Sequence, residues 1–172
     1  YYFDGLHEDP FPGEDRLITP SPHVATYDLK PDMSVLELTT QLIDRLKLGV
    51  YAFTVVNIAC PDMVAHTGNI AAAIKAVEAA DASVGQIVAQ TQSMDATCLI
   101  TADHGNVEEM IGPDGTMDTE HSTFPVPLLV IDRKFQGMGY SLPKGKLGDI
   151  APTILSHMGL PIPTEMTGNN LL

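Results

Sequence analysis

Basic residues, cysteines and long apolar runs are all scarce in this chain of 172 residues. Lys and Arg total 9 against 22 Asp and Glu, a net charge of −13, which argues against a nucleic acid or an anionic membrane as the main partner. The two cysteines, Cys60 and Cys98, are flanked by apolar or small residues and indicate reduced, buried thiols rather than a disulfide framework. No apolar run approaches the roughly 18 residues that cross a bilayer. We therefore expect a soluble, cytoplasmic protein with no nucleic-acid and no membrane partner.

Three stretches have the residue pattern of helices. Apolar residues recur at helical spacing over residues 34–48, where Ser34 and Glu37, three residues apart, predict a capping box at the start. Residues 70–91 form a long Ala-rich stretch with its larger apolar side chains on one side. Residues 148–160 predict a last, short helix.

Three short apolar runs predict strands, at residues 51–59, 96–102 and 126–131. Strand, long helix, strand is a βαβ unit, and such continuous apolar strands favour a parallel sheet with helices on both faces. We therefore assign the chain to the α/β class. The turn-rich residues 112–119 predict a surface loop, and the Pro- and Gly-rich residues 1–33 predict an irregular N-terminal segment.

Five acids and imidazoles lie next to the ends of these predicted strands: Asp62, His66, Asp103, His104 and His121. Ligands of α/β sheets bind outside the carboxyl ends of the strands, so we expect the five side chains to meet there. Two carboxylates and three imidazoles suit Mn²⁺ or Zn²⁺ better than Mg²⁺ or Ca²⁺. The pattern therefore predicts two divalent cations that hold a phosphate or sulfate group between them.

Each motif taken alone also has a structural interpretation. Asp103 and His104 could cap a turn or the following helix. Asp62 and His66 could be a turn residue and an exposed histidine, and His121 alone carries no signal. We interpret His157, on the last predicted helix, as a surface or half-buried structural residue. Only the five residues together favour a metal site.

Short motifs along the whole chain form one ordered pattern. They are Pro-Phe-Pro-Gly-Glu-Asp-Arg at residues 10–16, Ser-Pro-His-Val-Ala-Thr-Tyr-Asp at 21–28, Asp-Met-Val-Ala-His-Thr-Gly at 62–68, Thr-Ala-Asp-His-Gly-Asn at 101–106, His-Ser-Thr-Phe-Pro-Val-Pro at 121–127, Ile-Ala-Pro-Thr at 150–153 and Glu-Met-Thr-Gly at 165–168. In this order the motifs resemble those of the cofactor-independent phosphoglycerate mutases, which belong to the alkaline phosphatase superfamily.

The resemblance implies an alkaline-phosphatase-like, three-layer α/β domain with a largely parallel sheet, of which residues 34–172 would be the C-terminal part. It also implies two metal ions, Mn²⁺ first and Zn²⁺, Co²⁺ or Fe²⁺ as alternatives. The implied reaction interconverts 3-phosphoglycerate and 2-phosphoglycerate through a phosphoserine, in glycolysis and gluconeogenesis. By position, one metal would be held by Asp62, His66 and His121, and the second by Asp103 and His104 among its ligands.

In the family, the nucleophilic serine comes from an N-terminal part of the chain that these residues do not match. We therefore assign no catalytic residue here and expect a longer, monomeric parent enzyme. The 172 residues alone should be inactive, should bind at most one metal well and could self-associate through an open sheet edge.

Two positions depart from the family pattern. His23 stands where the family usually has a lysine near the transferring phosphate, so we assign it to substrate binding, and Ala65 replaces a usual glycine. The alternatives are a related phosphatase or phosphopentomutase of the same superfamily, or a non-catalytic metal-binding fragment.

Overall fold

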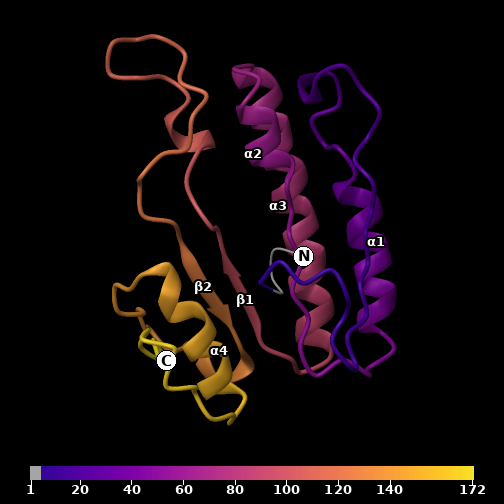
Figure 1. Cartoon of the computed structure of the whole chain (residues 1–172), viewed down its shortest axis with the longest axis vertical. Coiled ribbons are helices and arrows are strands. Elements are labelled where there is room, and N and C mark those ends of the chain that lie inside the picture. The colour runs from indigo at the N-terminus through magenta and orange to yellow at the C-terminus, as the bar shows by residue number, and fades with distance from the viewer. Residues whose placement is uncertain (1–4) are drawn as a thin grey trace. The chain divides into compact units, whose positions relative to one another are not determined.

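A computed structural model describes residues 5–172 of the chain (Figure 1). Its helices are α1 (Val35–Leu46), α2 (Cys60–Ala65), α3 (Ile70–Ser93) and α4 (Ile150–His157), and its strands are β1 (Cys98–Thr101) and β2 (Leu128–Ile131). Four 3₁₀ turns complete the elements: η1 (Tyr27–Leu29), η2 (Val107–Glu109), η3 (Arg133–Phe135) and η4 (Leu147–Asp149). Among the described residues no helix is both long and apolar enough to cross a membrane.

The chain divides into two compact units. Unit 1 comprises Tyr1–Thr91 and Asn106–Glu120, and unit 2 comprises Gln92–Gly105 and His121–Leu172. The chain therefore crosses from one unit to the other next to two of the predicted ligands, His104 and His121.

Unit 1 is built on small side chains. Ala72, Ala73 and Ala76 of α3 are at most 5% exposed and pack with Val64 and Ala65 of α2, which are fully buried. The methyl of Ala65 lies inside this core of mostly small side chains. The alanine at the family's glycine position is thus accommodated in an ordinary helix.

The face of α3 that the sequence pattern selected is only partly correct. Ile87 is buried as expected, but Ile74 and Val77 are 55% and 41% exposed. The alanine side of the helix forms the core instead, because close helix packing favours the smallest side chains.

Helix α1 begins one residue after Ser34, as predicted, but the predicted capping box is wrong. The Ser34 hydroxyl donates to the carbonyl of Pro20 at 2.6 Å and makes no cap bond to the helix. Glu37 accepts from the side chain of Gln41, one turn further on, at 3.0 Å. A partner distant in sequence replaced the local one.

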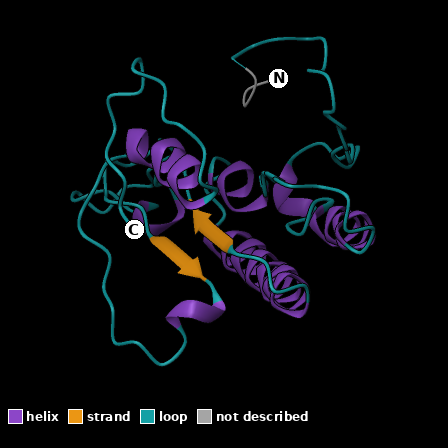
Figure 2. Ribbon diagram, turned by 90° about the horizontal axis from the view of Figure 1, so that it is seen from below, coloured by secondary structure: helices purple, strands orange, loops and turns teal. Residues whose placement is uncertain are grey.

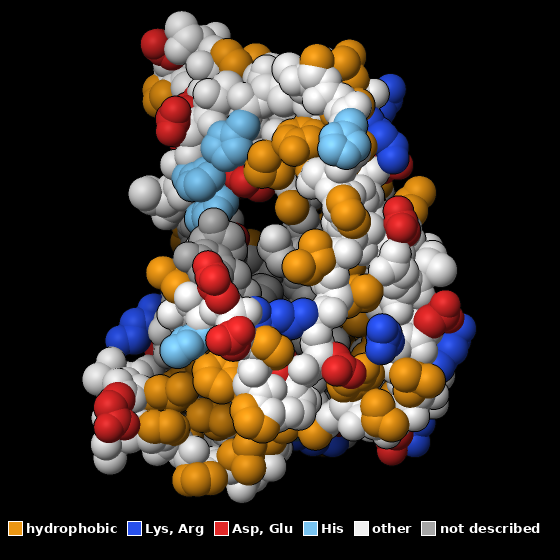
Figure 3. Space-filling view, turned by 45° about the vertical axis from the view of Figure 1, so that its right-hand side comes forward, with side chains coloured by type: hydrophobic (Ala, Val, Ile, Leu, Met, Phe, Trp, Pro, Cys, Tyr) orange, Lys and Arg blue, Asp and Glu red, His pale blue; other side chains and the backbone are white. Residues whose placement is uncertain are grey.

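The predicted strand at residues 51–59 is wrong as well, because this stretch is irregular in the structure. Among the described residues it has no strand partner, and Phe53 and Val55 are 54% and 49% exposed. A strand exists only where a neighbouring strand takes up its backbone hydrogen bonds. Exposed hydrophobic side chains (orange) are also frequent on the face drawn in Figure 3.

The other two predicted strands are confirmed, but their direction differs from the expectation. β1 and β2 pair antiparallel, with Cys98 opposite Ile131 and Thr101 opposite Leu128, as the opposed arrows in Figure 2 show. They lie in a two-stranded sheet within the described residues, so the parallel βαβ pairing expected from the pattern is not formed by this pair. The chain remains of the α/β class, as a partial domain.

Polar groups fasten the end of the chain to α4 in unit 2. The buried carboxylate of Asp149 accepts from the backbone N–H of Lys146 and of Asn169, each at 2.8 Å. Thr153 accepts from the N–H of Leu171 at 3.0 Å. A Cβ added at Gly168 would lie 2.0 Å from the carbonyl oxygen of Gly148, so only glycine permits this close approach.

Candidate metal centre

In unit 1, α2 carries Asp62 and is followed directly by His66. The sequence pattern did not predict this short helix, although Pro61 in its first turn is a typical start signal. The spacing of four residues brings the two side chains to one side of the helix, and Asp62 Oδ1 lies 3.3 Å from His66 Nε2. A carboxylate and an imidazole are therefore already adjacent, as a shared cation requires.

The hydrogen bonds of His66 determine which ring nitrogen carries the proton. Nδ1 lies 2.6 Å from the carbonyl oxygen of Thr119, and a carbonyl only accepts, so Nδ1 is the donor. In the neutral ring the lone pair is then on Nε2, the nitrogen that faces Asp62. Metal-binding histidines commonly donate their second N–H to a carbonyl in this way.

Asn106 is a site residue to which sequence reasoning gave no role. Its Nδ2 donates to Asp62 Oδ1 at 2.7 Å and lies 3.5 Å from His66 Nε2. The side chain is 4% exposed, and its Oδ1 is a buried acceptor without a hydrogen-bond partner among the described residues. An unpartnered buried oxygen beside a carboxylate and an imidazole fits a site for a cation. The sequence signal that could have identified Asn106 is its position in the motif Asp-His-Gly-Asn, next to two predicted ligands.

In unit 2, His104 and His121 lie face to face. Their ring centroids are 3.6 Å apart and the ring planes differ by 18°. The N–H of Ser122 donates to the carbonyl of Gly105 at 2.8 Å, so the backbone beside one histidine holds the backbone beside the other.

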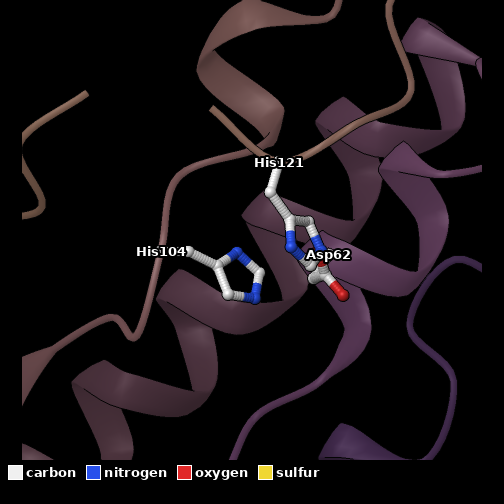
Figure 4. A group of neighbouring side chains, drawn as sticks. All are labelled: Asp62, His104 and His121. Atoms are coloured by element: carbon white, nitrogen blue, oxygen red, sulfur yellow. The ribbon is translucent and has the colours of Figure 1, made fainter. Parts of the chain in front are cut away.

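The set labelled in Figure 4 is Asp62, His104 and His121, which offer one carboxylate and two imidazoles. Asp62 belongs to unit 1, and both histidines belong to unit 2. Asp103 has an 85% exposed side chain, with Oδ1 3.6 Å from His104 Nε2. His66 and Asp103 are outside that set, and the roles of all five residues as ligands stay predictions.

The segment after His23 borders a hollow of about 550 Å³ in unit 1, lined by residues 24–28 together with Met63, His66 and Thr67. His23 itself is exposed and is not part of the lining, so its role in substrate binding stays a prediction. Asp28 is in the lining, and hydrogen bonds from Thr26 and Asn69 lower the pKa of its carboxyl group.

The two cysteines play no part in this site. Cys60, the first residue of α2, is buried, with its thiol 3.6 Å from the carbonyl of Ala76, and burial raises its pKa to about 11. Both cysteines are free thiols; Cys60 is buried as predicted, whereas Cys98 is only half-buried.

Comparison with protein families identifies the class. The family described as the metalloenzyme superfamily matches residues 1–162, and the chain belongs to it. Binding of divalent metal is therefore supported both by the family and by the donor set.

Within this class, the chain is similar to 2,3-bisphosphoglycerate-independent phosphoglycerate mutases. It is 52% identical over 178 residues to that of Prochlorococcus marinus subsp. pastoris and 49% identical over 172 residues to that of Moorella thermoacetica. Both alignments cover 100% of this chain and 33% of the relative, so the chain spans about one third of the relatives' length.

A solved structure agrees in fold. The phosphoglycerate mutase of Leishmania mexicana, crystallised at low cobalt concentration, matches with a TM-score of 0.77 and 28% identity. The match covers 89% of this chain and 30% of that chain. The family resemblance drawn from the motifs is thus confirmed.

Proposed function

We propose that a protein containing this chain interconverts 3-phosphoglycerate and 2-phosphoglycerate through a phosphoserine, using two divalent metals. One observation carries the proposal: the chain aligns over its full length with mutases at about half identity. The serine nucleophile has no counterpart in these residues, so the 172 residues alone should be inactive. Cytoplasmic location and self-association through an open sheet edge stay predictions.

For the metal ligands we propose Asp62, His66 and His121 at one ion, with Asp103 and His104 contributing to the second. In unit 1, the tautomer of His66 supports this role, since its lone pair and the Asp62 carboxylate are adjacent. In unit 2, the stacking of the His104 and His121 rings supports it, because it brings two imidazoles together. When bound, the ions would neutralise charge on the transferring phosphoryl group and lower the pKa of a bound hydroxyl.

The metal's identity belongs to the same proposal. Two carboxylates and three imidazoles suit Mn²⁺, with Zn²⁺, Co²⁺ or Fe²⁺ as alternatives. The Leishmania mexicana relative was studied with cobalt, which supports a first-row divalent ion.

Asn106 and Thr119 would support the proposed metal ligands without binding the metal themselves. Asn106 would hold the Asp62 carboxylate in place through its bond at 2.7 Å. The carbonyl of Thr119 would keep His66 in the tautomer that exposes Nε2 to a metal. Both act by orienting a ligand.

Calorimetric titration of the chain with Mn²⁺ tests the ligand assignment. We expect one well-bound ion per chain, and Asp62→Asn should weaken it by more than the roughly 10- to 100-fold that loss of a group bonded to a ligand costs. Asp44→Asn, at a 69% exposed surface carboxylate, is the matched control and should bind like the wild type.

Two tight sites per chain, or equal affinity in both variants, would contradict the assignment. The reaction itself is tested by assaying a longer protein that contains this chain. Absence of phosphoglycerate interconversion with Mn²⁺ bound would refute the mutase proposal, and a substrate panel would then examine the related phosphatase activities.

A further inference from the structure

A second polar cluster lies in unit 2, at the end of the strand pair opposite to Asp103 and His104. Because β1 and β2 are antiparallel, the residue before β1 and the residue after β2 lie at the same end of the pair (Figure 2). They are Thr97 and Asp132, and His157, the last residue of α4, joins them.

The contacts of this cluster are short and partly shielded from water. Thr97 Oγ1 lies 2.7 Å from Asp132 Oδ2 and 2.8 Å from His157 Nε2. Lys134 Nζ lies 3.0 Å from His157 Nδ1. The side chains of Asp132 and His157 are only 16% and 18% exposed.

The donors and acceptors can be arranged in one direction only. A lysine ammonium donates and never accepts, so Nδ1 of His157 must be the acceptor and carry no proton. The proton of the neutral ring is then on Nε2, which donates to the Thr97 hydroxyl, and that hydroxyl donates to Asp132. The chain of bonds runs from Lys134 through His157 and Thr97 to the carboxylate.

Lys134 also begins a segment that borders an apolar cavity. Residues 133–146, called the strap here, contain the 3₁₀ turn η3 and no α-helix or strand. Phe135, Met138 and Tyr140 of the strap line a cavity of about 740 Å³ together with residues of β2. Lys134 Nζ lies 4.8 Å from the centre of the Phe135 ring, so the bond to His157 fastens the strap at its beginning.

We propose that His157 is a proton-sensitive fastening of this strap: the neutral ring holds Lys134, and the protonated ring releases it. A proton added at Nδ1 occupies the lone pair that accepts from Lys134. It also leaves an imidazolium and an ammonium group in direct contact, where they repel each other. Histidine is the side chain that ordinarily changes charge between about pH 5 and 8.

The charged side chains that contact His157 among the described residues are Asp132 and Lys134. Asp132 stays ionised through this range, because its bond from the Lys134 backbone N–H, and then the Thr97 hydroxyl, lower the pKa of its carboxyl group. Its Oδ2 is already 3.6 Å from Lys134 Nζ, so the released ammonium keeps a partner. The neighbouring Arg133 is paired with Asp95 at 3.2 Å. Protonation should therefore move the Lys134 ammonium from His157 to Asp132 and loosen the strap beyond it, while the Lys134 backbone N–H and α4 stay attached.

Nuclear magnetic resonance of the chain tests this. At pH 8, ¹⁵N shifts of His157 should show the Nε2–H tautomer, and between pH 8 and 5 the methyl signal of Met138, assigned with Met138→Leu, should follow the titration of His157. In His157→Gln an amide oxygen and an amide N–H replace the two ring nitrogens without a titratable group. The pH-dependent shift of Met138 should be lost there.

Lys134→Met should leave the titration of His157 observable but uncouple Met138 from it. An Nδ1–H tautomer at pH 8 would overturn the proposal even if neither variant folded. A pH-dependent shift of the Met138 methyl signal that persists unchanged in His157→Gln would also overturn it. Neither measurement requires metal, so the result is independent of the proposed mutase function.

Discussion

Helices α2 and α4 both end beside a histidine whose Nε2 lies close to an aspartate oxygen, at 3.3 Å in His66 and 3.5 Å in His157. The third partner differs. A backbone carbonyl faces Nδ1 of His66, whereas a lysine ammonium faces Nδ1 of His157. The two rings therefore hold their protons on opposite nitrogens, and only His66 directs a lone pair toward its carboxylate. We therefore propose the aspartate–histidine pair as metal ligands in unit 1 and as a structural link in unit 2.

The largest expected effect is a difference in Mn²⁺ binding between variants of His66 and of His157. His66→Gln removes an imidazole ligand and should weaken Mn²⁺ binding by at least about 100-fold, since even groups bonded to ligands are worth roughly 10- to 100-fold. The identical change at His157 should leave Mn²⁺ affinity unaltered. Calorimetry on both variants measures this, and equal losses would show that the tautomer argument does not separate the two sites.

A smaller effect concerns the packing under α2. Ala76 is fully buried against this helix, so Ala76→Leu should lower the free energy of unfolding by about 1–3 kcal/mol through overpacking. It should also weaken Mn²⁺ binding, because α2 carries Asp62. Ala71→Leu, at an exposed position of α3, is the control in denaturant titrations and should be nearly neutral. A stable Ala76→Leu variant would show that the core tolerates larger side chains.

The smallest effect concerns the hydrogen bonds of the Asp149 carboxylate in unit 2. Backbone N–H groups of Asn169 and Lys146 lower the pKa of the Asp149 carboxyl group. A lowered folded-state pKa contributes stability above the unfolded value, about 3.9, and this contribution is lost as the pH falls through the folded value. Asp149→Asn should therefore unfold at a lower temperature than wild type at pH 7, with the difference shrinking toward pH 3. A difference that is constant with pH would exclude the carboxylate charge as its origin.

Local patterns predicted the helices well. The long helix and the start of α1 followed from the spacing of apolar residues. The end of α4 followed from Gly159, which comes directly after the C-cap residue and has a φ of +70°, as is usual for a glycine that ends a helix. The partners of Ser34 could not be predicted, because its hydroxyl bonds to a carbonyl 14 residues away. The strand at residues 51–59 failed for a related reason: apolar, β-branched composition creates a tendency, but pairing requires a neighbour.

The candidate site shows the same division. The family was predictable, because its motifs are ordered along the chain, and the five candidate ligands were visible in the sequence as acids and imidazoles near predicted strand ends; their roles as ligands stay predictions. The role of Asn106 was not predictable, because its contact with Asp62 joins residues 44 positions apart. Likewise His157 was correctly interpreted as half-buried, but its partners Thr97 and Lys134 come from other segments.

The sequence by itself determined the class of this protein, the helices α1, α3 and α4, the kinds of atoms offered to a metal and its kinship with the phosphoglycerate mutases. Only the tertiary structure decided the direction of the strand pair, the alanine face that forms the core and the proton-bearing nitrogen of each histidine. The physical reason is that composition and spacing act along the chain, whereas hydrogen-bond direction depends on which donor or acceptor folding brings within about 3 Å.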